Sequence, residues 1–227
     1  MGKKKIFSVH QPNFIPWLGY FDKINNSDVF IILDDVLIPR GTSVANRNKI
    51  LSNNGIIELT FPISHPKGNN RLTSYKDILF VDEKSKQKIF KTIQSTYLKA
   101  PFYKKVITLL EEVFNEDSFC KMNITYIRKV CELLNINTEI ILMSDLKTDG
   151  QKNELIVGLG KLINGDVYLS GTGAKSYNDE AFFNANGIEL VYQNYKPENY
   201  IQFNSTESIA YLSSLDYLFN KGFNSPF

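Results

Sequence analysis

The sequence predicts an α/β protein with a doubly wound, mostly parallel sheet, a small β extension and a helical insertion. Apolar runs at residues 5–9 and 29–33 flank a short amphipathic segment, and strand and helix patterns alternate again from residue 138 onward. Such alternation is typical of parallel strands joined by helical crossovers. We therefore expect a single α/β domain over residues 1–227, with 36–81 as the β/loop extension and 82–135 as the helical insertion.

The first unit consists of a strand, a polar turn, a helix and a second strand. Residues 5–9 predict the first strand, which ends in His10-Gln11-Pro12. Pro16 suits the first position of a helix that begins near Trp17. The second strand, residues 29–33, ends in Asp34-Asp35. One imidazole and two carboxylates therefore stand where the first two strands finish.

Residues 36–81 form the predicted extension. Short strand-like runs at 49–51, 57–61 and 78–81 predict a small antiparallel structure. Between them, residues 62–74 are rich in Pro, Gly and Asn and predict an exposed loop, which is a candidate lid.

The helical insertion begins at Asp82, a typical N-cap residue, and restarts at Pro101. Its third helix contains Cys120 and Cys131, eleven residues apart, which places them about 16 Å apart along the axis. A disulfide needs a separation below about 7 Å, so we expect reduced thiols, and two cysteines without CxxC spacing argue against a zinc site.

The final third alternates strands at 138–143, 167–170 and 188–192 with helices near 155–163 and 179–185, and a last helix ends at Gly222. Completing the sheet in this way brings several strand ends to one crevice. Ligands of open α/β sheets bind in that crevice.

Composition narrows the class of protein further. The chain has 227 residues, 43% of them hydrophobic, and a formal charge of +2, which gives no argument for a nucleic-acid partner. No apolar run approaches the ~20 residues that span a bilayer. We expect a soluble, cytoplasmic protein without a membrane span. Its 13% aromatic content leaves room for an apolar interface, so a homo-oligomer is possible.

His10 is the best candidate for a general base, because a neutral imidazole accepts protons near pH 7. Asp34 and Asp35 are the other candidate catalytic residues. Consecutive strand residues point to opposite faces, so only one of the two carboxylates should face the crevice, where it would orient His10 or accept a hydrogen bond from a sugar hydroxyl or an amine. We expect no metal site.

Candidate substrate-binding residues surround these three. Trp17 and Tyr20 are suited to stacking on a base or sugar ring, and guanidinium groups match phosphate oxygens. A second candidate segment follows the strand at 167–170, where glycines let a ligand approach the backbone. The predicted set is Gln11, Trp17, Tyr20, Arg40, Asn46, Arg47, Asn48, Ser170, Gly171, Gly173, Lys175 and Tyr177. Proximity of His10, Arg47 and Ser170 would support one shared site, and a scattered arrangement would contradict a mechanism that uses all three.

These residues give the chain a resemblance to the WbqC-like protein family along nearly its full length. The matching signatures include His10-Gln11-Pro12 with Pro16-Trp17, Leu33-Asp34-Asp35, Asn46-Arg47-Asn48, Tyr168-Leu169-Ser170-Gly171, and Ser214-Leu215-Asp216 with Gly222. The opening unit also resembles, at the level of fold, the Rossmann-like HUP-type nucleotidylyltransferases and pantothenate synthetase, but it lacks their paired-histidine turn.

The resemblance implies a role in bacterial O-antigen or surface-polysaccharide (lipopolysaccharide) biosynthesis, as a transferase that moves glycine or another acyl or aminoacyl group to an amino sugar. The implied partners are a nucleotide-linked amino sugar and an activated donor such as an acyl or peptidyl carrier-protein thioester, with no further cofactor. Two alternatives stay open. One is an ATP- and Mg-dependent adenylating amide ligase or nucleotidylyltransferase-like enzyme, and the other is a non-catalytic module that binds a nucleotide sugar or carrier protein.

Overall fold

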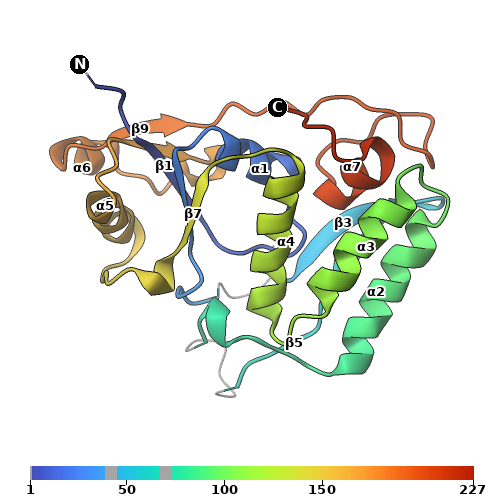
Figure 1. Ribbon diagram of the computed structural model, residues 1–227. Helices are drawn as coiled ribbons and strands as arrows, with labels where there is room; N and C mark the ends of the chain where they lie inside the picture. Colours follow the sequence, from blue (N-terminus) through green and yellow to red (C-terminus); the bar gives the residue numbers. More distant parts are fainter. Residues whose placement is uncertain (1, 39–44, 67–72) are drawn as a thin grey trace.

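The computed structural model describes residues 2–38, 45–66 and 73–227 and has a central parallel sheet in the order β7-β2-β1-β8-β9 (Figure 1). All four neighbouring pairs are parallel. The predicted doubly wound α/β fold is therefore confirmed. The strands are β1 (Ile6–His10), β2 (Val29–Ile32), β7 (Glu139–Leu142), β8 (Val167–Ser170) and β9 (Glu189–Tyr192).

The direction in which the chain builds this sheet reverses once. From β1 the chain adds β2 and then β7 on one side; it then crosses back through α5 (Lys152–Leu162) and adds β8 and β9 on the other side of β1. The reversal lies between β1 and β8, in a Rossmann-like strand order. Ligands of such sheets bind beyond the carboxyl ends of the strands at this point.

Successive side chains of each strand point to opposite faces of the sheet, and each face has its own hydrophobic core. Phe7 and Val9 of β1 pack with α5 and α6 (Glu180–Ala185), whereas Phe30 and Ile32 of β2 pack with α1 (Leu18–Asn25) and α4 (Phe119–Leu133). Figure 1 shows these two helix layers on opposite sides of the sheet. Because successive side chains alternate, His10 belongs to the α1 face.

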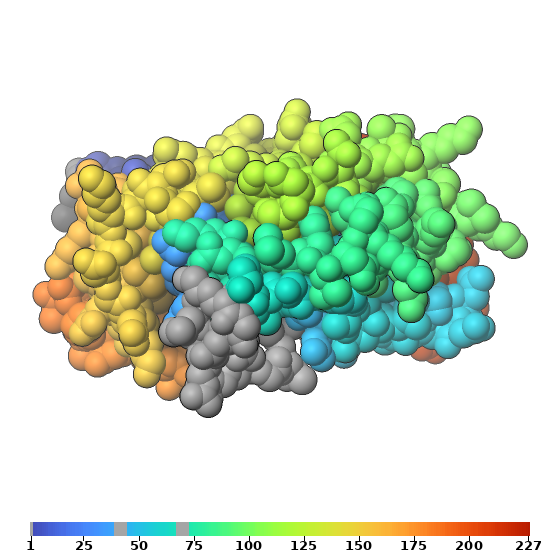
Figure 2. Space-filling view, turned by 90° about the horizontal axis from the view of Figure 1, so that it is seen from below, coloured from blue at the N-terminus to red at the C-terminus, as the bar shows by residue number. Residues whose placement is uncertain are grey.

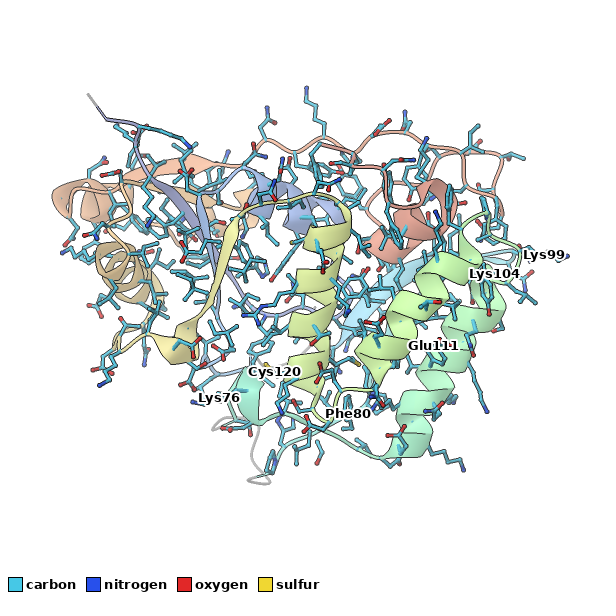
Figure 3. All side chains as sticks on the ribbon, viewed as in Figure 1. Lys76, Phe80, Lys99, Lys104, Glu111 and Cys120 are labelled. Atoms are coloured by element: carbon cyan, nitrogen blue, oxygen red, sulfur yellow. The ribbon has the colours of Figure 1, made fainter. Side chains whose placement is uncertain are left out.

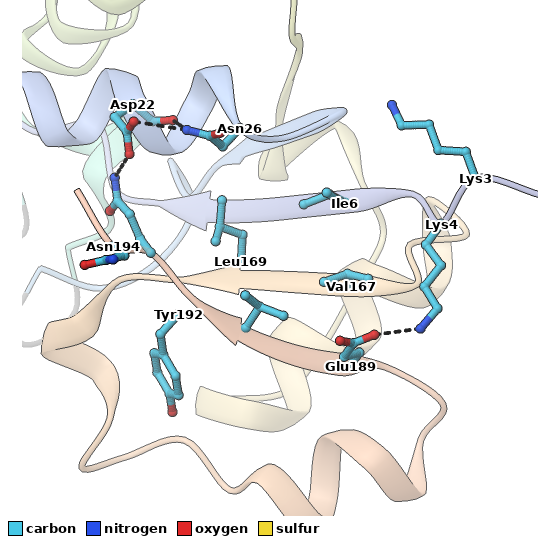
Figure 4. Close-up of a pocket in the computed structure, with 12 residues that line it drawn as sticks. Lys3, Lys4, Ile6, Asp22, Asn26, Val167, Leu169, Glu189, Tyr192 and Asn194 are labelled. Carbon is cyan, nitrogen blue, oxygen red and sulfur yellow. Dashed lines mark hydrogen bonds and ion pairs between the residues drawn. The ribbon is translucent and has the colours of Figure 1, made fainter. Parts of the chain in front are cut away.

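The α1 face of β8 and β9 is only partly covered. Ile6, Val167, Leu169 and Val191 line a hollow of about 710 Å³ there, which we call the sheet-face hollow (Figure 4). Val191 is 38% exposed.

The predicted antiparallel extension consists of two separate small sheets in the described residues. One pairs β3 (Arg47–Ser52) with β4 (Gly55–Thr60), and the other pairs β5 (Ile63–Ser64) with β6 (Leu79–Phe80). The short η2 turn (Tyr75–Asp77) precedes β6.

The helical insertion comprises α2 (Glu83–Tyr97), α3 (Tyr103–Phe114) and α4. Asp82 caps α2 as predicted, since its carboxylate accepts from the Ser85 N–H. Cys120 and Cys131 are free and buried, as expected. Figure 3 places Cys120 at the start of α4, and Figure 2 shows the insertion at the opposite end of the molecule from α5 and α6.

The last helix, α7 (Ser214–Lys221), docks the C-terminal segment onto the insertion. Its buried Asp216 accepts hydrogen bonds from Tyr97, Tyr200 and Gln202. The helix ends at Gly222, whose φ of 72° is in the left-handed region that favours glycine. None of the described helices combines the length and the apolar character needed to cross a bilayer.

Candidate functional site

A second hollow, of about 240 Å³, lies at the reversal point of the sheet. We call it the His10 hollow. It is bounded by the end of β1, by α1, and by the loops that follow β8 and β9. It brings together these predicted site residues: His10, Trp17, Tyr20, Gly171 and Gly173. Its position is the one expected for a ligand site in this strand order.

The imidazole of His10 is held in one orientation. Its Nδ1 lies 3.2 Å from the carbonyl oxygen of Gln11, and its ring meets the Tyr20 ring edge-on with centroids 4.9 Å apart. A carbonyl oxygen only accepts, so Nδ1 carries the proton and Nε2 keeps its lone pair. Burial, and then the charge of Lys23, lower the His10 pKa to about 3, against the raising effect of Gln11. His10 is therefore a neutral acceptor at pH 7.

Lys23, in the last turn of α1, lines the same hollow. It is 4% exposed, and its Nζ donates to the Val9 carbonyl oxygen at 3.0 Å. Burial lowers its pKa to about 7. An amine that changes charge near neutral pH therefore stands in the candidate site.

Gly171 and Gly173 form the opposite edge of the hollow, at the η4 turn (Thr172–Ala174). A Cβ added to either glycine would meet no atom within 4 Å. β1 and β8 pair at Ile6–Val167 and Phe7–Tyr168, and beyond this pairing both His10 and Gly171 line the hollow. The fold does not require glycine at these positions, and their open backbone suits the approach of a ligand.

Gln193 connects the segment after β9 to α1. Its backbone N–H donates to the Ser170 carbonyl oxygen, and its side-chain amide donates to the Gly19 carbonyl oxygen and to the Asp22 carboxylate. This side chain separates the His10 hollow from the sheet-face hollow, because it lines both.

Aromatic side chains gather at the mouth of the hollow. The Trp17 ring lies 5.3 Å from the Tyr195 ring and 5.6 Å from the Tyr211 ring. The indole also lies directly over Gly19, where an added Cβ would come within 2.3 Å of it. Gly19 is therefore needed for Trp17 to adopt this position.

Both predicted catalytic carboxylates have protein partners outside the hollow. Asp34 is buried and accepts from the backbone N–H and hydroxyl of Ser144, in the η3 turn (Met143–Asp145) that follows β7. Asp35 pairs with Lys76 at 2.6 Å. Neither lines the His10 hollow. The Asp34 contacts join the ends of β2 and β7, and the Asp35–Lys76 pair attaches η2 to the end of β2.

The predicted Asn46-Arg47-Asn48 group supports the backbone near the site. Asn46 donates to the Phe61 carbonyl oxygen, and Arg47 pairs with Glu58 at 3.4 Å. Asn48 donates to the Ile15 carbonyl oxygen at 2.7 Å. None of the three lines the His10 hollow, and Arg40 lies outside the described residues.

Three predicted residues at the end of β8 and after it also lie away from the hollow. Ser170 is fully buried and accepts from the Asn178 amide, on the α6 side of the sheet. Lys175 lies over the Tyr192 ring at 5.1 Å, and Tyr177 is 69% exposed. The carbonyl oxygen of Gln11, rather than its side chain, holds His10 and Tyr20.

Sequence reasoning missed six lining residues: Gly19, Lys23, Thr172, Gln193, Asn194 and Tyr195. Lys23 could have been recognised from the sequence. It follows Gly19 by four positions and Tyr20 by three, on the buried stripe of α1, where a lysine is unusual. Among the described residues, no group of three or more His, Cys, Asp or Glu side chains is placed to hold a metal ion.

The fold and the hollow together define an α/β protein with a candidate ligand site at the reversal of a parallel sheet. Residues 11–226 match the model of the WbqC-like protein family, so the chain belongs to that family. It is also 27% identical over 227 residues to a protein of Mycobacterium tuberculosis (strain ATCC 25618 / H37Rv) named "Uncharacterized protein Rv1507c", covering 98% of this chain and 96% of that one. No solved structure matches.

Proposed function

We propose that this protein is a transferase that forms an amide on a nucleotide-linked amino sugar, with a glycyl, aminoacyl or other acyl group taken from an activated donor. The amino sugar would belong to bacterial surface-polysaccharide or O-antigen biosynthesis. The observation that carries the proposal is His10, whose Nε2 is an acceptor in a hollow at the reversal of the sheet. Family membership supports the biosynthetic setting.

In the proposed reaction, the sugar amine attacks the carbonyl carbon of the donor. A C–N bond forms, and the bond from that carbon to the thiolate or other leaving group breaks. The amine proton passes to His10 Nε2 and then to the leaving group.

The backbone at the edge opposite His10 is suited to stabilise the negative charge that develops on the donor carbonyl oxygen. The backbone N–H groups of Thr172 and Gly173 have no acceptor among the described residues, and both residues line the hollow. Preorganised N–H donors stabilise an oxyanion. The mechanism therefore uses His10 and this backbone, without Asp34, Asp35 or Arg47.

The hollow is smaller than the roughly 300–1,000 Å³ of most small-molecule pockets. We infer that it encloses the reacting end of the substrate, while the nucleoside lies outside against the aromatic mouth formed by Trp17, Tyr195 and Tyr211. Flat bases and sugar rings stack well on such side chains.

A thermal-shift screen tests this proposal. Nucleotide-linked amino sugars, ATP with magnesium, and acyl thioesters are added separately, because a ligand that binds the native state raises its stability. We expect a selective shift with an amino sugar, reduced in Gly173→Val. The absence of a shift with every nucleotide-linked amino sugar would contradict the proposal.

The strand order favours a second candidate, an ATP-dependent adenylating ligase, because it is a nucleotide-binding order. A shift with ATP alone, together with AMP release during amide formation, would select it. Ligand binding without product under every donor condition would instead indicate a binding module.

A further inference from the structure

The His10 hollow has an unusual balance of charge. None of the described side chains that line it is a carboxylate. The titratable groups that line it are His10 on β1, Tyr20 and Lys23 on α1, and Tyr195 after β9. Burial keeps His10 and Tyr20 neutral, since it lowers the pKa of the first and raises that of the second. Among these described groups, Lys23 alone offers a positive charge to a ligand.

The Lys23 ammonium group has more N–H donors than its described hydrogen bonds use. Its Nζ makes one described hydrogen bond, to the Val9 carbonyl oxygen, and lies 5.9 Å from the centre of the Phe30 ring on β2. An ammonium group has three N–H donors. Two are therefore left for a ligand that enters beside His10.

The carboxylates of Asp22 and Asp34 are engaged with other partners. Asp22, on the same helix, accepts from Gln193 and Asn26, and Asp34, after β2, accepts from Ser144. A buried cation without an acidic partner is unfavourable. An anionic ligand would remove that cost and would explain why a lysine lies on the buried side of α1.

We propose that Lys23 is the counter-charge for an oxyanion of the substrate, a phosphate or carboxylate group that enters the hollow beside His10. This inference rests on the proposed function only in taking the hollow as the substrate site. Lys23 would then take the role that the sequence assigned to Arg47, which is paired with Glu58. The open backbone at Gly171 and Gly173 leaves room for the anion.

Direct titration of the lysine tests the proposal without turnover. In protein labelled with ¹³C at the lysine ε-carbon, the Lys23 signal is assigned by its loss in Lys23→Met and followed from pH 5 to 11. The samples contain sodium pyrophosphate, sodium acetate or sodium chloride at equal ionic strength. An anion that pairs with the ammonium raises its pKa, and we expect an increase of at least about one unit. A rise with pyrophosphate alone identifies a phosphate, a rise with acetate alone identifies a carboxylate, and no rise with either overturns the proposal.

Variants provide a second test by calorimetry. At pH 6 the anion that shifts the titration should bind at least about tenfold more weakly to Lys23→Met. Lys104→Met, on the exposed surface of α3 (Figure 3), should bind like wild type. In wild type the affinity should fall by about tenfold per pH unit above pH 7, as the amine loses its proton. Wild-type affinity in a folded Lys23→Met would overturn the proposal.

The two proposals fail separately. Anion binding at Lys23 with no amide product from any donor would leave this inference standing and contradict the transferase. Amide formation by a Lys23→Met variant with unchanged KM would contradict this inference and leave the transferase proposal standing.

Discussion

His10 and Tyr20 donate hydrogen bonds to one shared acceptor, the carbonyl oxygen of Gln11, at 3.2 Å and 3.0 Å. The two side chains come from different elements, β1 and α1, and their rings are in edge-to-face contact. This arrangement fixes the imidazole tautomer and leaves Nε2 available in the hollow. It is the geometric basis of the proposed general base.

Replacing His10 by Gln should lower turnover by about 10²- to 10⁴-fold, because the amide has no lone pair of comparable basicity to take the amine proton. The second histidine offers a matched control, and His65→Gln should retain wild-type turnover. The thermal midpoint of each variant, measured by circular dichroism, shows whether the fold is kept. Near-normal turnover in folded His10→Gln would remove His10 from the role of base.

Lys23 should make the stability of the protein depend on pH. Its pKa falls from the ordinary 10.5 to about 7 on folding, so the unfolded chain binds more protons than the folded one between these values. Stability therefore rises with pH across that range, by roughly 4 kcal/mol from this one group. Urea unfolding at pH 6, 8 and 10 measures it.

The comparison with Lys23→Met isolates this effect from other titrating groups. The stability difference between Lys23→Met and wild type should be largest below pH 7, in favour of the variant, and should shrink toward pH 10. A difference that stays constant from pH 6 to pH 10 would show that Lys23 titrates normally in the folded protein.

Side chains added at the glycine edge should affect binding but leave folding intact. Gly171→Ala and Gly173→Val meet open space, so their thermal midpoints should stay close to wild type, whereas their KM should rise because the side chain occupies the position of the ligand. Gly19→Ala is the contrasting control, since its Cβ would collide with the Trp17 ring and should cost about 1–3 kcal/mol. Unchanged KM in both edge variants would argue against ligand binding at this edge.

Asn48 should contribute stability to the turn that joins β1 to α1. Ile15 in that turn has a φ of 37°, which is strained for a β-branched residue, and its carbonyl oxygen accepts from both Asn48 and Ser213. Asn48→Ala should lower the free energy of unfolding by about 1–2 kcal/mol. Chemical denaturation tests this value, and an unchanged midpoint would mean that Ser213 alone holds the carbonyl.

Much of the fold was predictable because local patterns agree with it. The strands at 5–9, 29–33 and 167–170 are short apolar runs, and Asp82 and Gly222 are ordinary cap residues. His10 and Gly171 each come directly after an apolar strand pattern in the sequence. Because ligands bind beyond the ends of such strands, this position predicts that the two residues share one crevice, and both line the His10 hollow.

The site was predictable only in part, because side-chain direction depends on register. Ser170 shares the face of Tyr168 and so points to α6, while the next residue, Gly171, reaches the hollow. Asn46 and Asn48 bond to carbonyl oxygens far away in sequence, which no local pattern reveals. Gln193 and Tyr195 reach α1 only because β9 ends beside it.

The most direct test of the central claim is a turnover assay in which UDP- and dTDP-linked amino sugars are incubated with the protein and the N-acetylcysteamine thioester of glycine. Mass spectrometry follows the product. We expect a nucleotide sugar that has gained one glycyl group in an amide bond, formed without ATP and abolished or strongly reduced in His10→Gln. Absence of the amide with every acceptor, or equal formation by His10→Gln, would contradict it.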